Sequence, residues 1–175
     1  MKAKKTVVHF ILMGGTIDSR WNKRTDTIEP NQESAVPDYF QNYNLLDETK
    51  FTQICMKDSR ALTDEDRKKM LEEIKNSPTD KIIITQGRFT MPESMRYLKK
   101  NLKDNNKTIV FTSATTPLIA FDFSDAPFNL GYSFAMVQHL APGIYVCTEG
   151  RSFTLEQVNE FIEEGRLHEI IASKE

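Results

Sequence analysis

The chain has 175 residues, of which 39% are hydrophobic and 27% are charged, and its formal net charge is −2. This length and composition predict a single domain over residues 1–175 with one sizeable core, and the charge gives no sign of a nucleic-acid partner. No stretch is long enough to span a membrane. Both cysteines lie in apolar segments, as buried free thiols do, and free thiols are typical of a reducing compartment. We therefore expect a cytoplasmic protein.

The first predicted element is a buried strand at residues 6–13. The lysines before it give the segment a superficial likeness to a short secretory signal. However, His9 interrupts the apolar run, and no small-residue cleavage site follows it. Because the run ends in Gly14, Gly15 and Thr16, we interpret it as a strand followed by a turn.

The segment at residues 18–47 is polar and contains two prolines. We expect a long mobile loop there, followed by one short helix near residues 37–46. A second strand is predicted at residues 51–56. Thr63 followed by Asp66 three residues later indicates the start of a helix with a capped N-terminus.

The second half of the chain alternates predicted strands and helices. Thr90 with Glu93, and Thr154 with Gln157, have the spacing of capping boxes and predict two helix starts. Gly165 is a suitable end for the last helix. The remaining elements are a helix at residues 127–140 and strands at residues 81–85, 108–112 and 143–148.

This alternation predicts an α/β fold: a three-layer α/β/α arrangement with a mostly parallel, Rossmann- or flavodoxin-like sheet. In open sheets of this kind, ligands bind outside the carboxyl ends of the strands. We therefore looked for functional residues in the four loops at residues 14–19, 57–62, 86–90 and 113–117.

These four loops resemble those of bacterial-type L-asparaginases. The stretch MGGTIDS resembles the nucleophile loop of that family, and KDSRALTDED resembles its substrate-carboxylate loop. ITQGRFTMPES resembles the family segment I-T-H-G-T-D-T-M-E-E-T, and FTSATTP with FSDAPFNL resembles T-G-A-M-x-P with S-D-x-x-F-N-L. The closing stretch APGIYVCTEGRSF is similar to that of short members with only the N-terminal domain. The resemblance implies the fold of that domain and a homo-oligomer, either a dimer or a tetramer.

The family hydrolyses a side-chain amide through a threonine nucleophile, and Thr16 occupies that position. A hydroxyl is a weak nucleophile and needs an activating group nearby. The alternative role of Thr16 is a turn threonine that bonds its own backbone. Gly15 and Gly87 let the backbone approach a ligand, and Ser59 stands at the carboxylate-binding position of the family.

The third loop departs most from the family pattern. Arg88 replaces a threonine that works with a lysine in the family. Phe89 replaces an aspartate that holds the α-ammonium group of the substrate. Arginine has no proton to accept at neutral pH, and phenylalanine cannot pair with an ammonium group. Gln86 replaces the family histidine, and we find no counterpart of the lysine. Thr90 matches the last threonine of the motif, and capping of the following helix explains it.

Arg60 stands where the family has a glutamine. With Arg88 it either forms an anion site, because guanidinium groups bind carboxylate or phosphate in a bidentate manner, or both are surface arginines, one of them bonded to Asp58 or Asp18. No residues have metal-ligand spacing and no nucleotide fingerprint is present, so we expect neither a metal nor a cofactor.

From these residues we expect an asparaginase-like homologue with a degraded active site. It would hydrolyse L-asparagine weakly or not at all and keep a pocket for a small carboxylate or amide. The alternatives are an amidohydrolase that uses Thr16 on another amide, and a structural or partner-binding module. The candidate catalytic residue is Thr16, and the candidate substrate-binding residues are Gly15, Ser59, Arg60, Gly87, Arg88 and Thr90.

Overall fold

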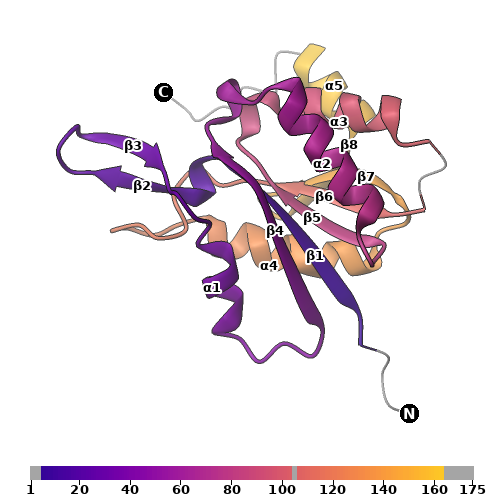
Figure 1. Ribbon diagram of the computed structural model, residues 1–175, viewed down its shortest axis with the longest axis horizontal. Coiled ribbons are helices and arrows are strands. Elements are labelled where there is room, and N and C mark those ends of the chain that lie inside the picture. The colour runs from indigo at the N-terminus through magenta and orange to yellow at the C-terminus, as the bar shows by residue number, and fades with distance from the viewer. Residues whose placement is uncertain (1–4, 104–105, 164–175) are drawn as a thin grey trace.

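The structure, a computed structural model, describes residues 5–103 and 106–163. Its centre is a six-stranded sheet with the order β4-β1-β5-β6-β7-β8 (Figure 1). Neighbouring strands are parallel except for β7 and β8, which confirms the predicted mostly parallel sheet. The strands are β1 (Val7–Gly14), β4 (Glu48–Lys57), β5 (Lys81–Thr85), β6 (Thr108–Thr112), β7 (Gly143–Thr148) and β8 (Arg151–Thr154).

Helices cover both faces of this sheet (Figure 1). One buried cluster unites alternate strand residues such as Ile82 and Ile84 with α2, α3 and α5, and the other unites Ile83 with α1 and α4. Strands covered on both faces have nearly continuous apolar sequences, which is why β5 could be predicted from the sequence. The helices are α1 (Val36–Gln41), α2 (Asp64–Asn76), α3 (Met91–Asn101), α4 (Ala126–His139) and α5 (Leu155–Glu163).

The predicted mobile loop after the first strand is wrong in part. It contains an antiparallel hairpin of β2 (Ser19–Asn22) and β3 (Thr27–Pro30), which projects from one end of the molecule (Figure 1). The hairpin was missed because most of its side chains are exposed, so it lacks the apolar pattern of a buried strand. The short helix α1 also begins and ends earlier than the predicted range of 37–46.

Helix starts follow the predicted caps in two cases of three. The Thr63 hydroxyl and the Asp66 carboxylate bond each other's backbone N–H groups at the start of α2. The Thr154 N–H likewise donates to Gln157 Oε1 at 2.9 Å. The cap predicted at Thr90 is wrong, because its side chain makes no capping hydrogen bond to α3. The predicted end of the last helix at Gly165 lies outside the described residues.

The two edges of the sheet differ in length. β8 has 4 residues and β4 has 10. Gln53 covers part of the β4 edge, because its side-chain amide donates to Gln32 O at 3.1 Å and accepts from Ser34 N at 3.0 Å. No helix in the described part of the chain is long and apolar enough to cross a membrane.

Candidate functional site

Four loops meet at a small cavity at the carboxyl end of the parallel strands. Three of them form single 3-10 turns directly after a strand: η1 (Thr16–Asp18) after β1, η2 (Ser59–Ala61) after β4 and η3 (Arg88–Thr90) after β5. The cavity lies where the strand order reverses, the usual ligand position in such sheets. Its volume is about 90 Å³, and its lining comprises Thr16, Asp58, Ser59, Gly87, Arg88, Phe89, Ala114 and Thr115.

Two glycines bring the first loop into backbone contact with the loops after β4 and β5. A Cβ atom on Gly15 would lie 2.3 Å from Gly87 N, and one on Gly14 would lie 2.5 Å from Lys57 N. Both glycines also have positive φ, +81° and +85° for Gly14 and Gly15. The Gly15 N–H donates to Lys57 O at 2.9 Å. Gly15 therefore positions Thr16 and does not itself line the cavity.

Thr16 lines the cavity and is half-buried. Within the described residues its hydroxyl does not form the hydrogen bond to its own backbone that is expected of a turn threonine; Ser19 Oγ instead donates to Gly15 O at 2.9 Å. None of the described residues that line the cavity is a lysine or a histidine. Its one carboxylate, Asp58, bonds an arginine, so the site offers Thr16 no evident general base.

Ser59 is 1% exposed, and its hydroxyl has no hydrogen-bond partner among the described residues. The hydroxyl faces the third loop: a Cβ atom on Gly87 would lie 2.9 Å from Ser59 Oγ. A buried hydroxyl without a partner costs about 1–3 kcal/mol. A polar group of a ligand in the cavity would remove that cost.

Arg88 brings a positive charge to the cavity. Its side chain is 11% exposed, and Nη1 lies 3.7 Å from Glu149 Oε1. Burial lowers the pKa of the guanidinium, while Glu149 and Asp125 act in the opposite direction. Since an arginine stays protonated under all ordinary conditions, Arg88 is a cationic residue in the cavity lining.

Glu149, which pairs with Arg88, was not predicted from the sequence. Glu149 and Gly150 have φ of 53° and 76° and form the tight turn between β7 and β8. Asn129 on α4 holds this turn, because its Oδ1 accepts from Glu149 N at 2.8 Å. The available signal was the Glu-Gly pair between two strand patterns, since glycine favours such two-residue hairpin turns.

Arg60 does not join Arg88 in the cavity. Its Nε donates to Asp58 Oδ1 at 3.0 Å, and its guanidinium lies 4.9 Å from the centre of the Phe89 ring. The side chain is 70% exposed. The hydrogen bond from Arg60 lowers the pKa of Asp58. Of the two arrangements left open by the sequence, Arg60 adopts the surface pairing with Asp58, and Arg88 but not Arg60 belongs to the cavity lining.

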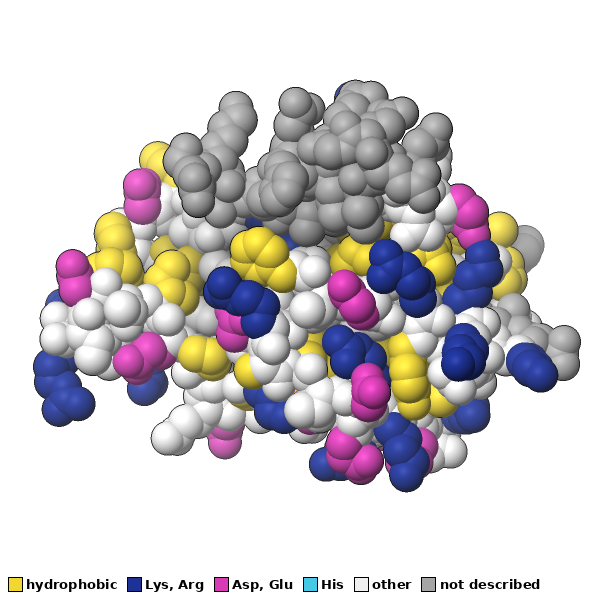
Figure 2. Space-filling model, turned by 90° about the horizontal axis from the view of Figure 1, so that it is seen from above, with side chains coloured by type: hydrophobic (Ala, Val, Ile, Leu, Met, Phe, Trp, Pro, Cys, Tyr) yellow, Lys and Arg dark blue, Asp and Glu magenta, His cyan; other side chains and the backbone are white. Residues whose placement is uncertain are grey.

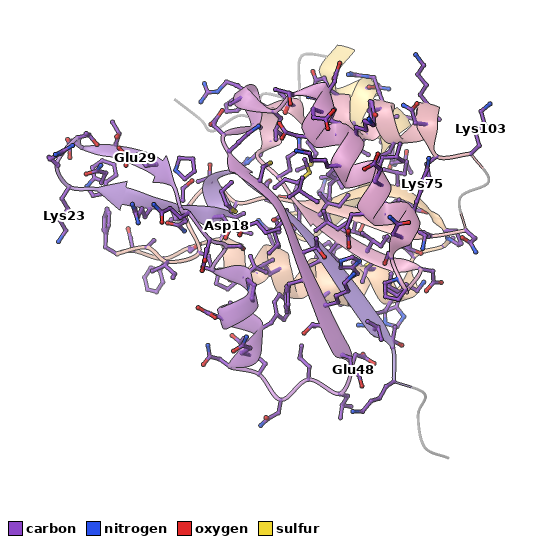
Figure 3. The ribbon with its side chains drawn as sticks, in the orientation of Figure 1. Asp18, Lys23, Glu29, Glu48, Lys75 and Lys103 are labelled. Atoms are coloured by element: carbon purple, nitrogen blue, oxygen red, sulfur yellow. The ribbon has the colours of Figure 1, made fainter. Side chains whose placement is uncertain are left out.

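Thr90 and Asp18 have supporting positions. The Thr90 hydroxyl donates to Ser59 O at 2.8 Å and so ties η3 to η2 outside the cavity lining. Asp18 is fully buried at the base of the hairpin (Figure 3), where its carboxylate accepts from Ser34 Oγ at 2.8 Å and from Ala35 N at 2.9 Å. Burial raises the pKa of Asp18, whereas the hydrogen bonds from Ser34 and Ala35 lower it.

Asp125 orders the fourth loop. Its carboxylate accepts from the N–H groups of Thr115 and Thr116 at 2.9 Å and from Asn129 Nδ2 at 3.2 Å. These hydrogen bonds fix the fourth loop against the start of α4. Among the residues that the structure describes, no three His, Cys, Asp or Glu side chains gather as a metal site would require.

Comparisons with known proteins point in one direction. The family model described as "Asparaginase, N-terminal" matches residues 7–164. The thermostable L-asparaginase from Thermococcus kodakarensis superposes with a TM-score of 0.72 at 21% identity, over 86% of this chain and 46% of its own. A probable cytoplasmic L-asparaginase from Campylobacter jejuni gives 0.69 at 25% identity, over 87% of this chain and 48% of its own. The chain thus spans about half the length of these neighbours, and no curated protein sequence matches it.

Proposed function

Because the chain belongs to the family of the asparaginase N-terminal domain, we propose that it is an asparaginase-like homologue with a degraded active site. It binds a small carboxylate or amide and hydrolyses L-asparagine weakly or not at all. The observation that carries this proposal is the small cavity whose lining includes Thr16, Ser59 and Arg88.

The cavity chemistry favours an anionic or polar ligand of a few heavy atoms. The volume of about 90 Å³ is well below the ~300–1,000 Å³ of pockets that enclose drug-sized ligands. Arg88 offers a guanidinium that matches a carboxylate, and the Ser59 hydroxyl is a buried donor without a partner among the described residues. The ligand carboxylate would compete with Glu149 for Arg88.

The same residues argue against efficient asparagine hydrolysis. Phe89 supplies no charge for an α-ammonium group, and Arg88 supplies no hydroxyl nucleophile. Each loss is expected to cost a few kcal/mol of transition-state stabilisation, or about a hundredfold or more in rate. The lining residues also provide no evident base for Thr16.

Thermal denaturation with succinate or aspartate tests the binding function. A ligand at about 100 times its Kd stabilises the native state by about 2.7 kcal/mol, so the melting temperature should rise measurably. Arg88→Met should abolish the rise. Arg60→Met is the matched control and should keep it, because Arg60 is exposed and pairs with Asp58. An equal rise in both variants would contradict the proposal.

Release of ammonia tests the catalytic part. With asparagine as substrate, we expect little or no release. Rapid release that Thr16→Ala abolishes would show that the active site is intact. If release is slow or absent, the double variant Arg88→Thr, Phe89→Asp would measure how much of the lost activity those two residues explain.

The exposed part of Thr16 favours one second candidate, an amidohydrolase for an amide without an α-ammonium group. Thr16 is one of the residues that line the cavity, and such a substrate would not need the missing aspartate. Offering unsubstituted amides and dicarboxylate monoamides tests this activity. Ammonia release that is lost in Thr16→Ala supports it.

We also propose that residues 1–175 form a single domain that acts in the cytoplasm and assembles as a homo-oligomer. The cysteine usage supports the compartment, since Cys55 and Cys147 are both free thiols. The Campylobacter jejuni neighbour, described as a probable cytoplasmic L-asparaginase, agrees with it.

A further inference from the structure

An apolar groove lies beside the candidate site, between the β2–β3 hairpin and the segment before α4. Its volume is about 450 Å³. Both segments project from the same end of the molecule (Figure 1), where hydrophobic side chains are exposed (Figure 2, left). The groove is lined by the apolar side chains of Trp21 and Ile28 from the hairpin and of Ile119 and Phe121 from the facing segment.

The apolar surface at this end is large for a monomer. Phe121 is 87% exposed, Phe123 is 96% exposed and Ile119 is 70% exposed, while Trp21 and Ile28 are exposed by 40% and 50%. At about 200 Å² for a large apolar side chain, these residues present roughly 700 Å² per copy. That exceeds the ~300–600 Å² patch of a typical monomer and approaches the ~800 Å² per partner of a standard interface.

Charged groups border the apolar surface in a self-complementary way. Arg20 and Lys23 line the hairpin side of the groove, and Asp122 lies between two exposed phenylalanines. Lys23 points away from the body of the molecule (Figure 3). In the described part of the chain none of these three residues forms a salt bridge, and the Asp122 carboxylate accepts only a local bond from Phe123 N at 2.7 Å.

We propose that this chain forms a twofold dimer in which the arm (residues 122–123) of each copy enters the groove of the other. This extends the homo-oligomer proposed above by assigning its surface. A twofold contact needs a projection and a matching hollow on one face, and the arm and the groove adjoin. The exchange buries Phe123 and brings Asp122 of each copy to Arg20 and Lys23 of the other. Thr115 lines both the groove and the candidate cavity, so the interface borders the site.

Light scattering after gel filtration of the full chain tests the dimer. The wild-type protein should have twice the mass of the 20.2 kDa chain. Phe123→Ser should raise the dimer dissociation constant at least about thirtyfold, because buried aromatic anchors dominate such interfaces. Leu46→Ser is the matched control: Leu46 is 87% exposed but lies between α1 and β4, so its loss should leave the mass unchanged. Far-ultraviolet circular dichroism checks that each variant is folded.

An exchange of charge tests the pairing itself. Asp122→Arg should be monomeric because it places like charges together, and so should the double variant Arg20→Asp, Lys23→Asp. An equimolar mixture should dimerise, since each arm then meets an opposite charge. A monomeric mixture would overturn the charge pairing that defines the proposed interface.

The remaining outcomes separate the proposals from each other. A wild-type chain that stays monomeric at its highest soluble concentration would overturn both the homo-oligomer and its surface, and would leave the groove for another occupant. A dimer that persists in Phe123→Ser and Asp122→Arg would overturn only the surface. Neither outcome bears on succinate binding, which depends on Arg88.

Discussion

Gly15 illustrates how much of the site depends on the absence of one side chain. Its backbone touches the third loop, and its φ of +85° is a conformation that other residues rarely adopt. A methyl group there would meet backbone atoms of Gln86 and Gly87, which cannot yield as a flexible side chain can. The contact between the first and third loops therefore requires glycine.

We predict that Gly15→Ala destabilises the protein by at least about 1–3 kcal/mol, the cost of a strained backbone conformation, with the steric clash adding to it. The measurement is the free energy of unfolding in denaturant. Gly131→Ala is the matched control, because Gly131 lies in α4 and the Cβ atom of an alanine there would have no atom of the described residues within 4 Å apart from those of the adjoining turns of that helix. That change should stabilise the protein by about 0.5–1 kcal/mol. Equal effects of the two changes would refute the steric account.

His9 is a buried polar residue far from the carboxyl ends of the strands. Its Nδ1 lies 2.9 Å from Ser77 Oγ, and its Nε2 lies 2.9 Å from Thr52 Oγ1. Burial lowers the pKa of His9 from 6.5 to about 4, with Lys50 adding to the effect and Glu73 opposing it. His9 is therefore neutral at pH 7, and the 3.4 Å contact with Glu73 is not an ion pair there.

Stability should consequently fall in acid. The pKa of His9 is lower in the folded state than in the unfolded state, so the unfolded chain binds the extra proton between pH 6.5 and about 4. The contribution is complete above pH 6.5 and is lost across that window; it amounts to about 3 kcal/mol. Denaturation of wild type and His9→Gln at several pH values checks this. The difference between them should shrink as the pH falls, and a constant difference would exclude the role of His9.

At the level of elements, the sequence predicted most of the buried parts of the fold and missed the β2–β3 hairpin and the edge strand β8. The residues of β5, β6 and β7 were predicted to the residue because burial on both faces leaves an apolar run. The hairpin of β2 and β3 carries no such signal. The cap predicted at Thr90 failed because a distant group, Ser59 O, takes its hydroxyl, and spacing along a chain does not report a tertiary partner.

The cap of α2 is a suitable test of an element. Asp66 both closes the capping box with Thr63 and accepts from Lys57 Nζ at 2.7 Å. Thr63→Ala should cost about 1 kcal/mol of unfolding free energy, while Thr63→Ser should cost little because it keeps the hydroxyl. Urea denaturation of the three proteins checks the order, and an alanine variant as stable as the serine variant would contradict it.

On the scale of the whole molecule, Asn129 joins segments that are distant in sequence. Its side chain is buried on α4, donates to Ser113 O at 3.0 Å and accepts from Glu149 N at 2.8 Å. It thus connects the loop after β6 to the turn that carries the partner of Arg88. The loops that line the cavity were predictable from strand order. The link through Asn129 to the turn that carries Glu149 was not, because Arg88 and Glu149 meet only after the sheet has formed.

Asn129→Ala should destabilise the protein by about 2 kcal/mol, since it leaves the buried Ser113 O and the Glu149 N–H without the Asn129 side chain as their partner. Amide hydrogen exchange should also accelerate in the turn at residues 148–151. The exposed Asn42, whose side chain bonds only Asp38 O among the described residues, provides the control, and Asn42→Ala should leave exchange in that turn unchanged. Unaltered exchange in the Asn129 variant would show that the turn holds itself.

The unequal borders of the sheet have a consequence for solubility. Unpaired strands are templates for pairing with other chains. β8 has only 4 residues and leads straight into α5, so it offers few free backbone groups, whereas the 10 residues of β4 offer many. Lysines 50 and 57 and the bridge from Gln53 to the 32–34 segment discourage such pairing along β4. Unwanted fibre growth from the folded protein should therefore start at β4, and only after that bridge has opened.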